Sequence, residues 1–310
     1  MIRADPAFPV KVVLDTDVGT DVDDALALGV LLGSPEIELV GVTCVYGDVG
    51  LRVRMVRKLL RLAGRPEVPV YAGMELPLLG VRPVFWPGHE GVGLLDAEDE
   101  ALLPEAEHAV DYLLRITAEY PGEIELVAIG PLGNVALAMR RDPEFLSRLA
   151  GLTIMGGVFR GPGRWAVRHN EHNIVSDPEA AQVVFGANPD CLLVPLDVTR
   201  QTVIRPADVA RIRAGGSAFA LAIADQVERY PRFQELGYTY LHDPLAVAML
   251  LDPSLGRYEE MRIEIETGGR VSEGMTVPII DPGGNNPVRV ALDVDVTRAE
   301  EFIVSRIAAV

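Results

Sequence analysis

Cysteine is nearly absent from this sequence: 310 residues contain only Cys44 and Cys191. The two do not form a CxxC pair, which argues against a disulfide framework and against a cysteine-based zinc site. Long apolar runs are also missing, because charge, glycine or proline interrupts each run well before the roughly 18 residues that span a membrane. Residues 1–9 lack the apolar stretch of a signal peptide. We therefore predict a soluble, cytoplasmic protein with reduced cysteines and no membrane partner.

Positive charge is scarce as well. The 28 lysines and arginines stand against 45 aspartates and glutamates, which gives a formal net charge of −17. Nucleic acids are polyanions that proteins bind through basic side chains, so this balance argues against a nucleic-acid polymer as partner. It argues equally against an anionic membrane surface. With 49% hydrophobic and 24% charged residues, the composition is that of a globular protein.

Short apolar segments alternate with amphipathic ones through the first two thirds of the chain. Strands are expected at residues 10–14, 37–45, 68–71, 124–129, 152–155 and 191–196, and helices at 25–32, 51–63, 108–119, 134–141 and 178–185. This alternation is typical of a parallel sheet covered on both faces. Later segments are less regular, with helices expected at 218–229 and 244–251 and strands at 258–266 and 287–296. We predict an α/β fold: a single Rossmann-like domain over residues 1–310, with a mostly parallel central sheet flanked by helices and a less regular C-terminal part.

Five aspartates fall within ten residues directly after the first predicted strand, where residues 15–24 read DTDVGTDVDD. Crowded carboxylates raise one another's pKa, and a helix N-terminus offsets only about 0.3–1 kcal/mol per charge. A bound cation would relieve the repulsion, and oxygen ligands favour Ca²⁺ or Mg²⁺ over zinc. The plainer alternative is a solvated turn that contains one helix cap.

Two other protein classes share part of this pattern. An EF-hand requires a bidentate glutamate at the twelfth loop position, which counted from Asp15 is Leu26. A phosphatase of the haloacid-dehalogenase type also begins with a strand and DxDxxT, but it needs a later lysine. The chain's only lysines, Lys11 and Lys58, are not placed for that role.

The motifs instead resemble those of the inosine–uridine-preferring nucleoside hydrolase family. Residues 15–28, DTDVGTDVDDALAL, are similar to a longer form of its N-terminal D-x-D-P-G-x-D-D-A signature. The further matches are TCVYGD (43–48), IGPLGN (129–134), IMGG (154–157), EHN (171–173), DPEAA (177–181), LDVT (196–199) and LHDPLAV (241–247). They follow the family order over most of the chain, and jointly they are far more specific than any one of them.

The resemblance implies Ca²⁺-dependent hydrolysis of the N-glycosidic bond of ribonucleosides to free base and ribose. The ion would be held by Asp17, Asp24, Asp243 and the backbone carbonyl of Ile129. Asp17 would also act as general base on a metal-bound water. His242 would protonate or hydrogen-bond the leaving base, a role that suits an ordinary histidine pKa near 6.5.

The resemblance further implies a set of residues around the nucleoside. They are Asp23, Asp48, His89, Met155, Glu171, Asn173, Tyr230 and Tyr238. Asp23 would contact the ribose, Glu171 and Asn173 its 5′ side, and a tyrosine (Tyr230, Tyr238 or Tyr240) the base. A purely structural network for the glutamate and asparagine, and a core position for the tyrosines, are the alternatives.

Three departures from the family pattern bear on the substrate. Asp48 replaces a common asparagine, and His172 occupies a position that is usually aromatic. A Gly-Asn pair is missing where this chain reads GRW (163–165), and Trp165 or Asn170 is a candidate replacement. A nucleoside with an altered sugar or 5′ substituent, or another N-ribosyl compound, is therefore an alternative substrate, and an inactive riboside-binding protein is an alternative function. The base-contacting loops match least, so neither purine nor pyrimidine preference is predicted, while the family suggests a homodimer or homotetramer.

Overall fold

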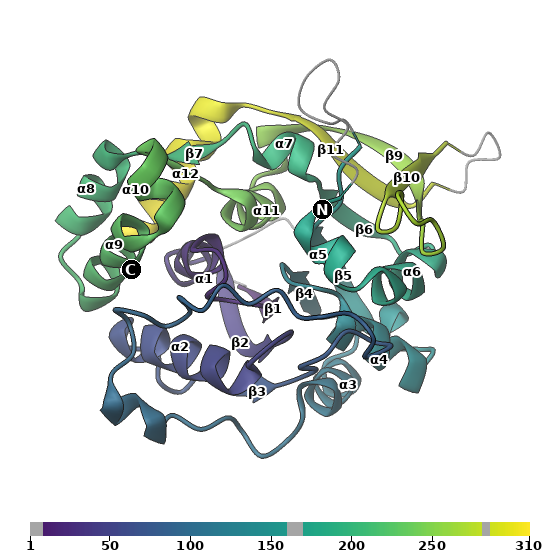
Figure 1. Ribbon diagram of the computed structural model, residues 1–310, viewed down its shortest axis with the longest axis horizontal. Coiled ribbons are helices and arrows are strands. Elements are labelled where there is room, and N and C mark those ends of the chain that lie inside the picture. The colour runs from purple at the N-terminus through teal and green to yellow at the C-terminus, as the bar shows by residue number, and fades with distance from the viewer. Residues whose placement is uncertain (1–8, 160–169, 281–285) are drawn as a thin grey trace.

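A nine-stranded sheet forms the centre of the computed structural model, which describes residues 9–159, 170–280 and 286–310 (Figure 1). Its strand order is β10-β9-β11-β6-β5-β4-β1-β2-β3. These strands are β1 (Val10–Thr16), β2 (Ile37–Cys44), β3 (Val70–Ala72), β4 (Ile124–Ala128), β5 (Leu149–Met155), β6 (Cys191–Val194), β9 (Gly256–Ile265), β10 (Thr276–Ile279) and β11 (Val288–Val294). A second, two-stranded sheet pairs β7 (Val203–Ile204) with β8 (Thr239–Tyr240).

Most of the large sheet is parallel. Strands β3, β2, β1, β4, β5, β6 and β11 all run in one direction, while β9 is antiparallel to its neighbours β11 and β10. Parallel neighbours need long crossover connections, and helices supply most of them here. The predicted α/β fold with a mostly parallel sheet is confirmed.

Helices cover both faces of this sheet (Figure 1). They are α1 (Asp23–Leu32), α2 (Val49–Leu62), α3 (Ala109–Glu119), α4 (Gly133–Arg141), α5 (His172–Ser176), α6 (Pro178–Gly186), α7 (Leu196–Thr199), α8 (Pro206–Ala214), α9 (Ala218–Arg229), α10 (Pro231–Leu236), α11 (His242–Leu251) and α12 (Val296–Ala308). Short 3₁₀ turns lie at Ala97–Ala101, Leu146–Arg148 and Pro253–Leu255. Because alternate side chains of a strand point to opposite faces, Val12 and Leu14 join one core with α1 and α11, whereas Val13 joins the other with α3 and α6.

The C-terminal part contains more structure than the sequence predicted. Helix α12 was not predicted, although Asp295 caps it by accepting from the Arg298 backbone N–H. Its buried side chains, among them Ile303 and Ile307, recur at helical spacing. Helix α8 was also missed. So were strand β10 and the short helices α5, α7 and α10, because segments of four to six residues are too short for a period to be recognised.

Helices α1 and α11 are apolar on nearly every side, as expected of helices enclosed by other elements. They pack against each other, and α12 packs against both. Each is ten residues long, and no helix in the described parts of the chain is long and apolar enough to cross a membrane. Acidic residues stand in the first turn of both helices, which places carboxylates at the edge of the buried core.

Candidate active site

A pocket of about 1030 Å³ lies where the parallel strands β1, β4 and β5 end. Ligands of open parallel sheets bind at this edge, beyond the carboxyl ends of the strands. The polar and sulfur-containing side chains that line it include Asp17, Asp21, Asp23, Asp24, His89, Met155, Glu171, His172, Asn173, Tyr230, Arg232, His242 and Asp243. Ile129 also lines it. Most of the residues predicted from the sequence are therefore brought together in one cavity.

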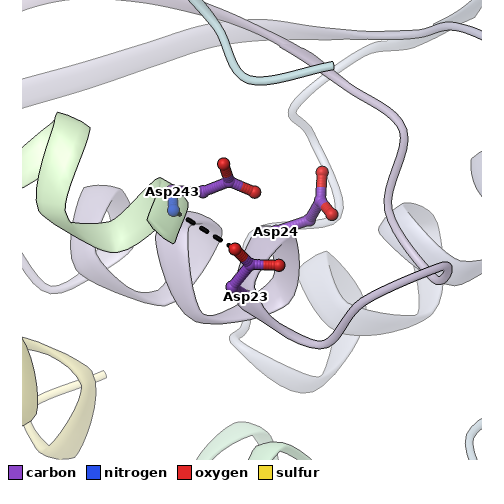
Figure 2. Close-up of side chains that lie close together, drawn as sticks. All are labelled: Asp23, Asp24 and Asp243. Atoms are coloured by element: carbon purple, nitrogen blue, oxygen red, sulfur yellow. Dashed lines mark hydrogen bonds between the residues drawn. The ribbon is translucent and has the colours of Figure 1, made fainter. Parts of the chain in front are cut away.

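Three buried aspartates face one another at the start of α1 and α11 (Figure 2). Each of Asp23, Asp24 and Asp243 offers a carboxylate oxygen, and these oxygens all lie within 4.8 Å of one another. The Asp243 backbone N–H donates to Oδ2 of Asp23 at 3.3 Å, which ties the two helix ends together. Burial, and then repulsion from the neighbouring carboxylates, raises the pKa of all three groups well above the usual range.

This cluster has the chemistry of a site for a hard cation. None of the three carboxylates forms an ion pair with a residue in the described part of the chain. Thr16 Oγ1 donates to Asp24 at 2.5 Å, but a hydroxyl cannot compensate three buried charges. Oxygen donors alone favour Ca²⁺ or Mg²⁺ over softer metals. The residues present fit a divalent cation.

The predicted ligands Asp17 and Ile129 lie on the wall of the same pocket. Oδ1 of Asp17 approaches Gly130 so closely that a Cβ there would come within 2.9 Å of it, so glycine permits this approach. The Ile129 carbonyl accepts a hydrogen bond from Asn173 Nδ2 at 2.7 Å, which leaves its second lone pair available. The resemblance implied that Asp17 is a metal ligand and that Asp23 contacts the sugar. In the structure, the carboxylate cluster that could hold a metal ion contains Asp23 and does not contain Asp17.

A buried arginine that the sequence did not predict as a site residue, Arg52, holds the backbone of the acidic segment 15–24. Arg52 is fully buried and donates to the backbone carbonyls of Asp17, Val18 and Tyr46, and to Thr20 Oγ1. Its Nη2 lies 3.9 Å from Oδ2 of Asp17. The sequence feature that could have identified Arg52 is its position on the same side of α2 as the buried residues Val49, Val53 and Val56.

Asp15 lies behind the pocket wall. Its Oδ2 accepts from Thr43 Oγ1 at 2.5 Å and from Asn134 Nδ2 at 2.7 Å. Burial raises the pKa of Asp15 to about 7, although both hydrogen bonds oppose the increase. Asn134 also donates to the carbonyl of Cys44, so this network joins the ends of β1 and β2 to the start of α4.

Glu171 and Asn173 form one wall of the pocket. The Glu171 carboxylate caps α5, where it accepts the backbone N–H groups of Asn173, Ile174 and Gly157. Asn173 Nδ2 donates to the carbonyls of Ile129 and Met155. The structural network that the sequence left open as an alternative is present, and it stands at the surface of the cavity.

Of the three candidate tyrosines, Tyr230 lines the pocket and donates to Asp21 at 2.7 Å. The ring centroids of Tyr240 and His242 lie 5.1 Å apart, and Tyr238 packs against the other side chain of this pair, Tyr240, at 5.7 Å. His89 lines the pocket at an edge-to-face distance of 6.0 Å from Tyr230. Tyr238 is not among the residues that line the pocket, so its contact with substrate stays a prediction.

His242 is held by Thr199, whose Oγ1 lies 2.7 Å from Nδ1. Burial, and then the charges of Arg232 and Arg200, lowers the pKa of His242 to about 3. The imidazole is therefore neutral at pH 7, which differs from the expectation based on an ordinary pKa near 6.5. A neutral ring still offers one N–H donor to a ligand in the pocket.

Asp48, which was predicted to lie beside the cation and substrate, is not among the residues that line the pocket. It is exposed, and its carboxylate caps α2 by accepting the Leu51 backbone N–H at 2.8 Å. Tyr46 and Gly47 precede it with left-handed φ values of 66° and 79°. Asn170 lines the pocket, and Trp165 lies outside the described residues.

Comparisons with known proteins match nearly the whole chain. The model of the family "Inosine-uridine preferring nucleoside hydrolase" matches residues 12–301. The chain is 32% identical to a probable uridine nucleosidase from Oryza sativa subsp. japonica, over 94% of this chain and 91% of the relative. It is 35% identical to the inosine-uridine preferring nucleoside hydrolase of Leishmania major, over 87% and 88%. The solved structure of a purine-preferring ribonucleoside hydrolase from Gardnerella vaginalis superposes with a TM-score of 0.85 and 31% identity, covering 96% of this chain and 98% of that one.

Proposed function

Because the chain belongs to the inosine-uridine preferring nucleoside hydrolase family, we propose that it hydrolyses the N-glycosidic bond of ribonucleosides with the help of Ca²⁺. The products are the free base and ribose. The observation that carries the proposal is the buried triad of Asp23, Asp24 and Asp243, set in a pocket at the carboxyl ends of the strands. The names of the relatives include both uridine and purine nucleosides, so the proposal covers both classes.

Different acidic side chains bind the ion and the sugar. Asp17, Asp24, Asp243 and the Ile129 carbonyl would hold Ca²⁺, while Asp23 hydrogen-bonds the ribose hydroxyls. When bound, Ca²⁺ supplies a fixed positive charge that orients the sugar diol and makes a water molecule more acidic. Asp17 then accepts the proton of the attacking water. The carboxylates and amide oxygens of the pocket stabilise the positive charge that develops on the sugar ring.

His242 assists the departure of the base as a neutral hydrogen-bond donor. With Nδ1 facing Thr199, the remaining ring nitrogen is available to the base if it carries the proton. This role follows from the lowered pKa of about 3, since a cationic imidazole is not populated at neutral pH. Glu171 and Asn173 shape the wall on the sugar side, and Tyr230 and His89 shape the wall beside Asp21.

We expect the activity to show no falling limb near pH 6.5. A cationic donor with an ordinary histidine pKa would lose activity above that pH, whereas a group with a pKa of about 3 has already lost its proton throughout the range. The measurement is kcat for the wild type and for His242→Gln from pH 5.5 to 8.5. The variant should lose about 10²- to 10⁴-fold in kcat with an unchanged profile. A falling limb that is present in the wild type and absent in the variant would contradict the neutral donor.

The decisive test of the proposed function is a panel of inosine, uridine, cytidine and adenosine, assayed for free ribose with Ca²⁺ or with a chelator. We expect ribose from at least one nucleoside, loss of activity with chelator, and recovery when Ca²⁺ is restored. Tight binding without ribose release would identify an inactive riboside-binding protein instead. Turnover of another N-ribosyl compound, with none of the four cleaved, would favour the altered-substrate alternative.

The acidic triad also predicts how the stability of the metal-free protein depends on pH. The pKa of Asp23, Asp24 and Asp243 is raised on folding, so the folded state binds their protons more tightly than the unfolded state does. The free energy of unfolding should therefore fall as the pH rises from 5 to 8. Ca²⁺ at 100 to 1,000 times its Kd should restore about 3–4 kcal/mol at pH 8.

Urea denaturation of dialysed protein at pH 5, 6.5 and 8, with and without Ca²⁺, measures this dependence. Burial also raises the pKa of Asp15 and Glu125 to about 7, and both contribute a dependence of the same sign. Their contribution is the same with and without Ca²⁺, so the difference between the two series reports the groups that Ca²⁺ contacts, which on this proposal include Asp24 and Asp243. Identical curves with and without Ca²⁺ would contradict calcium binding in this pocket.

A cytoplasmic location and a homodimer or homotetramer stay predictions. The segment after β3 exposes the apolar side chains Leu76, Leu79, Val81 and Phe85, each more than half accessible in the single chain. Clustered exposed apolar side chains are typical of contact surfaces between protein subunits. Light scattering coupled to size-exclusion chromatography measures the oligomeric state, and a monomer at micromolar concentration would contradict the prediction.

A further inference from the structure

His172 lies on the pocket wall at the start of α5, between Glu171 and Asn173 in the sequence. Its ring meets Tyr46 edge-to-face at 6.0 Å and Phe85 at 5.7 Å. These two aromatic contacts orient the imidazole. Its Nε2 atom is buried and lies 3.7 Å from Oδ2 of Asp17.

The hydrogen bonds of this wall leave few polar atoms free to bind a ligand. Both Glu171 oxygens accept backbone N–H groups, and Asn173 Nδ2 donates to two carbonyls. Nε2 of His172, by contrast, has no hydrogen-bond partner among the described residues. A buried polar atom without a partner is uncommon in proteins and calls for a specific explanation.

The distance between His172 and Asp17 suggests what that explanation is. A separation of 3.7 Å is too long for a hydrogen bond between the two atoms themselves. A single oxygen atom can nevertheless lie about 2.8 Å from both, because such distances close a triangle on a 3.7 Å base. Nε2 then donates to that oxygen, while Asp17 accepts the proton that the oxygen carries.

We propose that Nε2 of His172 and Oδ2 of Asp17 bind the same oxygen atom, which makes His172 a contact residue for the reaction. The inference rests on the proposed nucleoside hydrolase function. The oxygen belongs to a sugar hydroxyl or to the attacking water, which share the same hydrogen-bonding chemistry. His172 thereby supplies a donor that neither Glu171 nor Asn173 Nδ2 has left to offer.

Two substitutions test the contact. His172→Phe keeps an aromatic ring against Tyr46 and Phe85 but removes the nitrogen, whereas His172→Gln retains an amide donor at a similar distance. We expect His172→Phe to lower kcat/KM on the best natural nucleoside at least tenfold, and His172→Gln to recover part of this loss. Thermal unfolding should be nearly unchanged, since the ring contacts persist. His172→Leu serves as a second apolar variant if the phenylalanine variant proves unstable.

Deoxynucleosides distinguish the two sources of the oxygen. If the loss disappears for the 2′-, 3′- or 5′-deoxy analogue, His172 contacts that sugar hydroxyl. An equal loss of kcat on every substrate, with KM unchanged, identifies the attacking water. A stably folded His172→Phe or His172→Leu variant that stays within twofold of wild type on all substrates overturns the proposal.

The wild-type protein serves as the control that separates this inference from the proposed function. If the Ca²⁺-loaded wild type binds nucleosides without releasing ribose, the proposed function fails. The same variants are then compared by their dissociation constants for those nucleosides. A tenfold weaker affinity in His172→Phe still supports the contact, and an unchanged affinity overturns it.

Discussion

Asp17→Ala reduces kcat for nucleoside hydrolysis by at least about 10³-fold, which is the largest effect on activity that we expect from a single substitution. General base catalysis contributes about 10²- to 10⁴-fold, and this variant also removes a proposed ligand of the ion. Asp17 is buried on the pocket wall, where its Oδ2 lies 3.9 Å from Arg52 Nη2 and 3.7 Å from His172 Nε2. No other described carboxylate lies between these two side chains to replace it. The measurement is steady-state release of ribose at saturating Ca²⁺.

Asp17→Asn separates the two roles of this residue. An asparagine keeps an oxygen ligand but cannot accept a proton, so Ca²⁺ binding should survive while kcat is still lost. Asp48→Ala is the matched control, since this aspartate also follows a parallel strand but is exposed and outside the pocket. It should leave kcat within twofold and cost about 0.5–2 kcal/mol of stability through the lost helix cap. Full turnover by Asp17→Ala would exclude it as the base.

Arg52→Met should produce the largest loss of stability, about 3–5 kcal/mol. Removing the guanidinium leaves the carbonyls of Asp17, Val18 and Tyr46 without their donor in a buried setting. It also removes the guanidinium that lies 3.9 Å from the Asp17 carboxylate, and breaking a buried charged pair costs about this much. Trp86, whose ring lies 5.0 Å from the guanidinium, loses a packing partner as well.

Urea denaturation in the presence of chelator measures this loss without the contribution of a bound metal ion. Arg54→Met provides the control, because Arg54 lies on the same helix, is only partly buried and forms no ion pair with a described residue. Its effect should stay within about 0.5 kcal/mol. Equal losses in the two variants would show that Arg52 has no special role beneath the turn.

Patterns that repeat at short range predicted much of the fold. The strands from β1 to β6 are mostly apolar because the sheet is covered on both faces. Each is visible as a short apolar run, although a charged residue interrupts three of them, at Lys11, Glu38 and Glu125. The weaker predictions concern the C-terminal part, where antiparallel strands and a helix adjoin. There, β11 ends at Val294 and α12 begins at Val296, so the change of period falls within a single turn.

The candidate site was predicted where a residue type is itself unusual. Five aspartates in ten residues carry a cost that a bound cation would relieve, and two further family motifs, EHN and LHDPLAV, bring polar residues to the same edge. The predicted residues that do not line the pocket are ones whose position depends on side-chain direction. Asp48 follows a strand like the other site residues, but it turns outward to cap a helix. Tyr238 packs against Tyr240, and Tyr240 in turn packs against His242, which lines the pocket.

The sequence by itself determined the alternation of strands and helices, the acidic turn and the order of the family motifs, because these depend on residue type and local spacing. Only the tertiary structure decided which of these groups meet. Packing of α1 against α11 brings Asp243 to within hydrogen-bonding distance of Asp23, 220 positions earlier in the chain. Burial beside two arginines determines that His242 is neutral. Burial of Arg52 places its guanidinium against the backbone carbonyls of Asp17 and Val18. Desolvation and distance are properties of the packed molecule, so no local pattern encodes them.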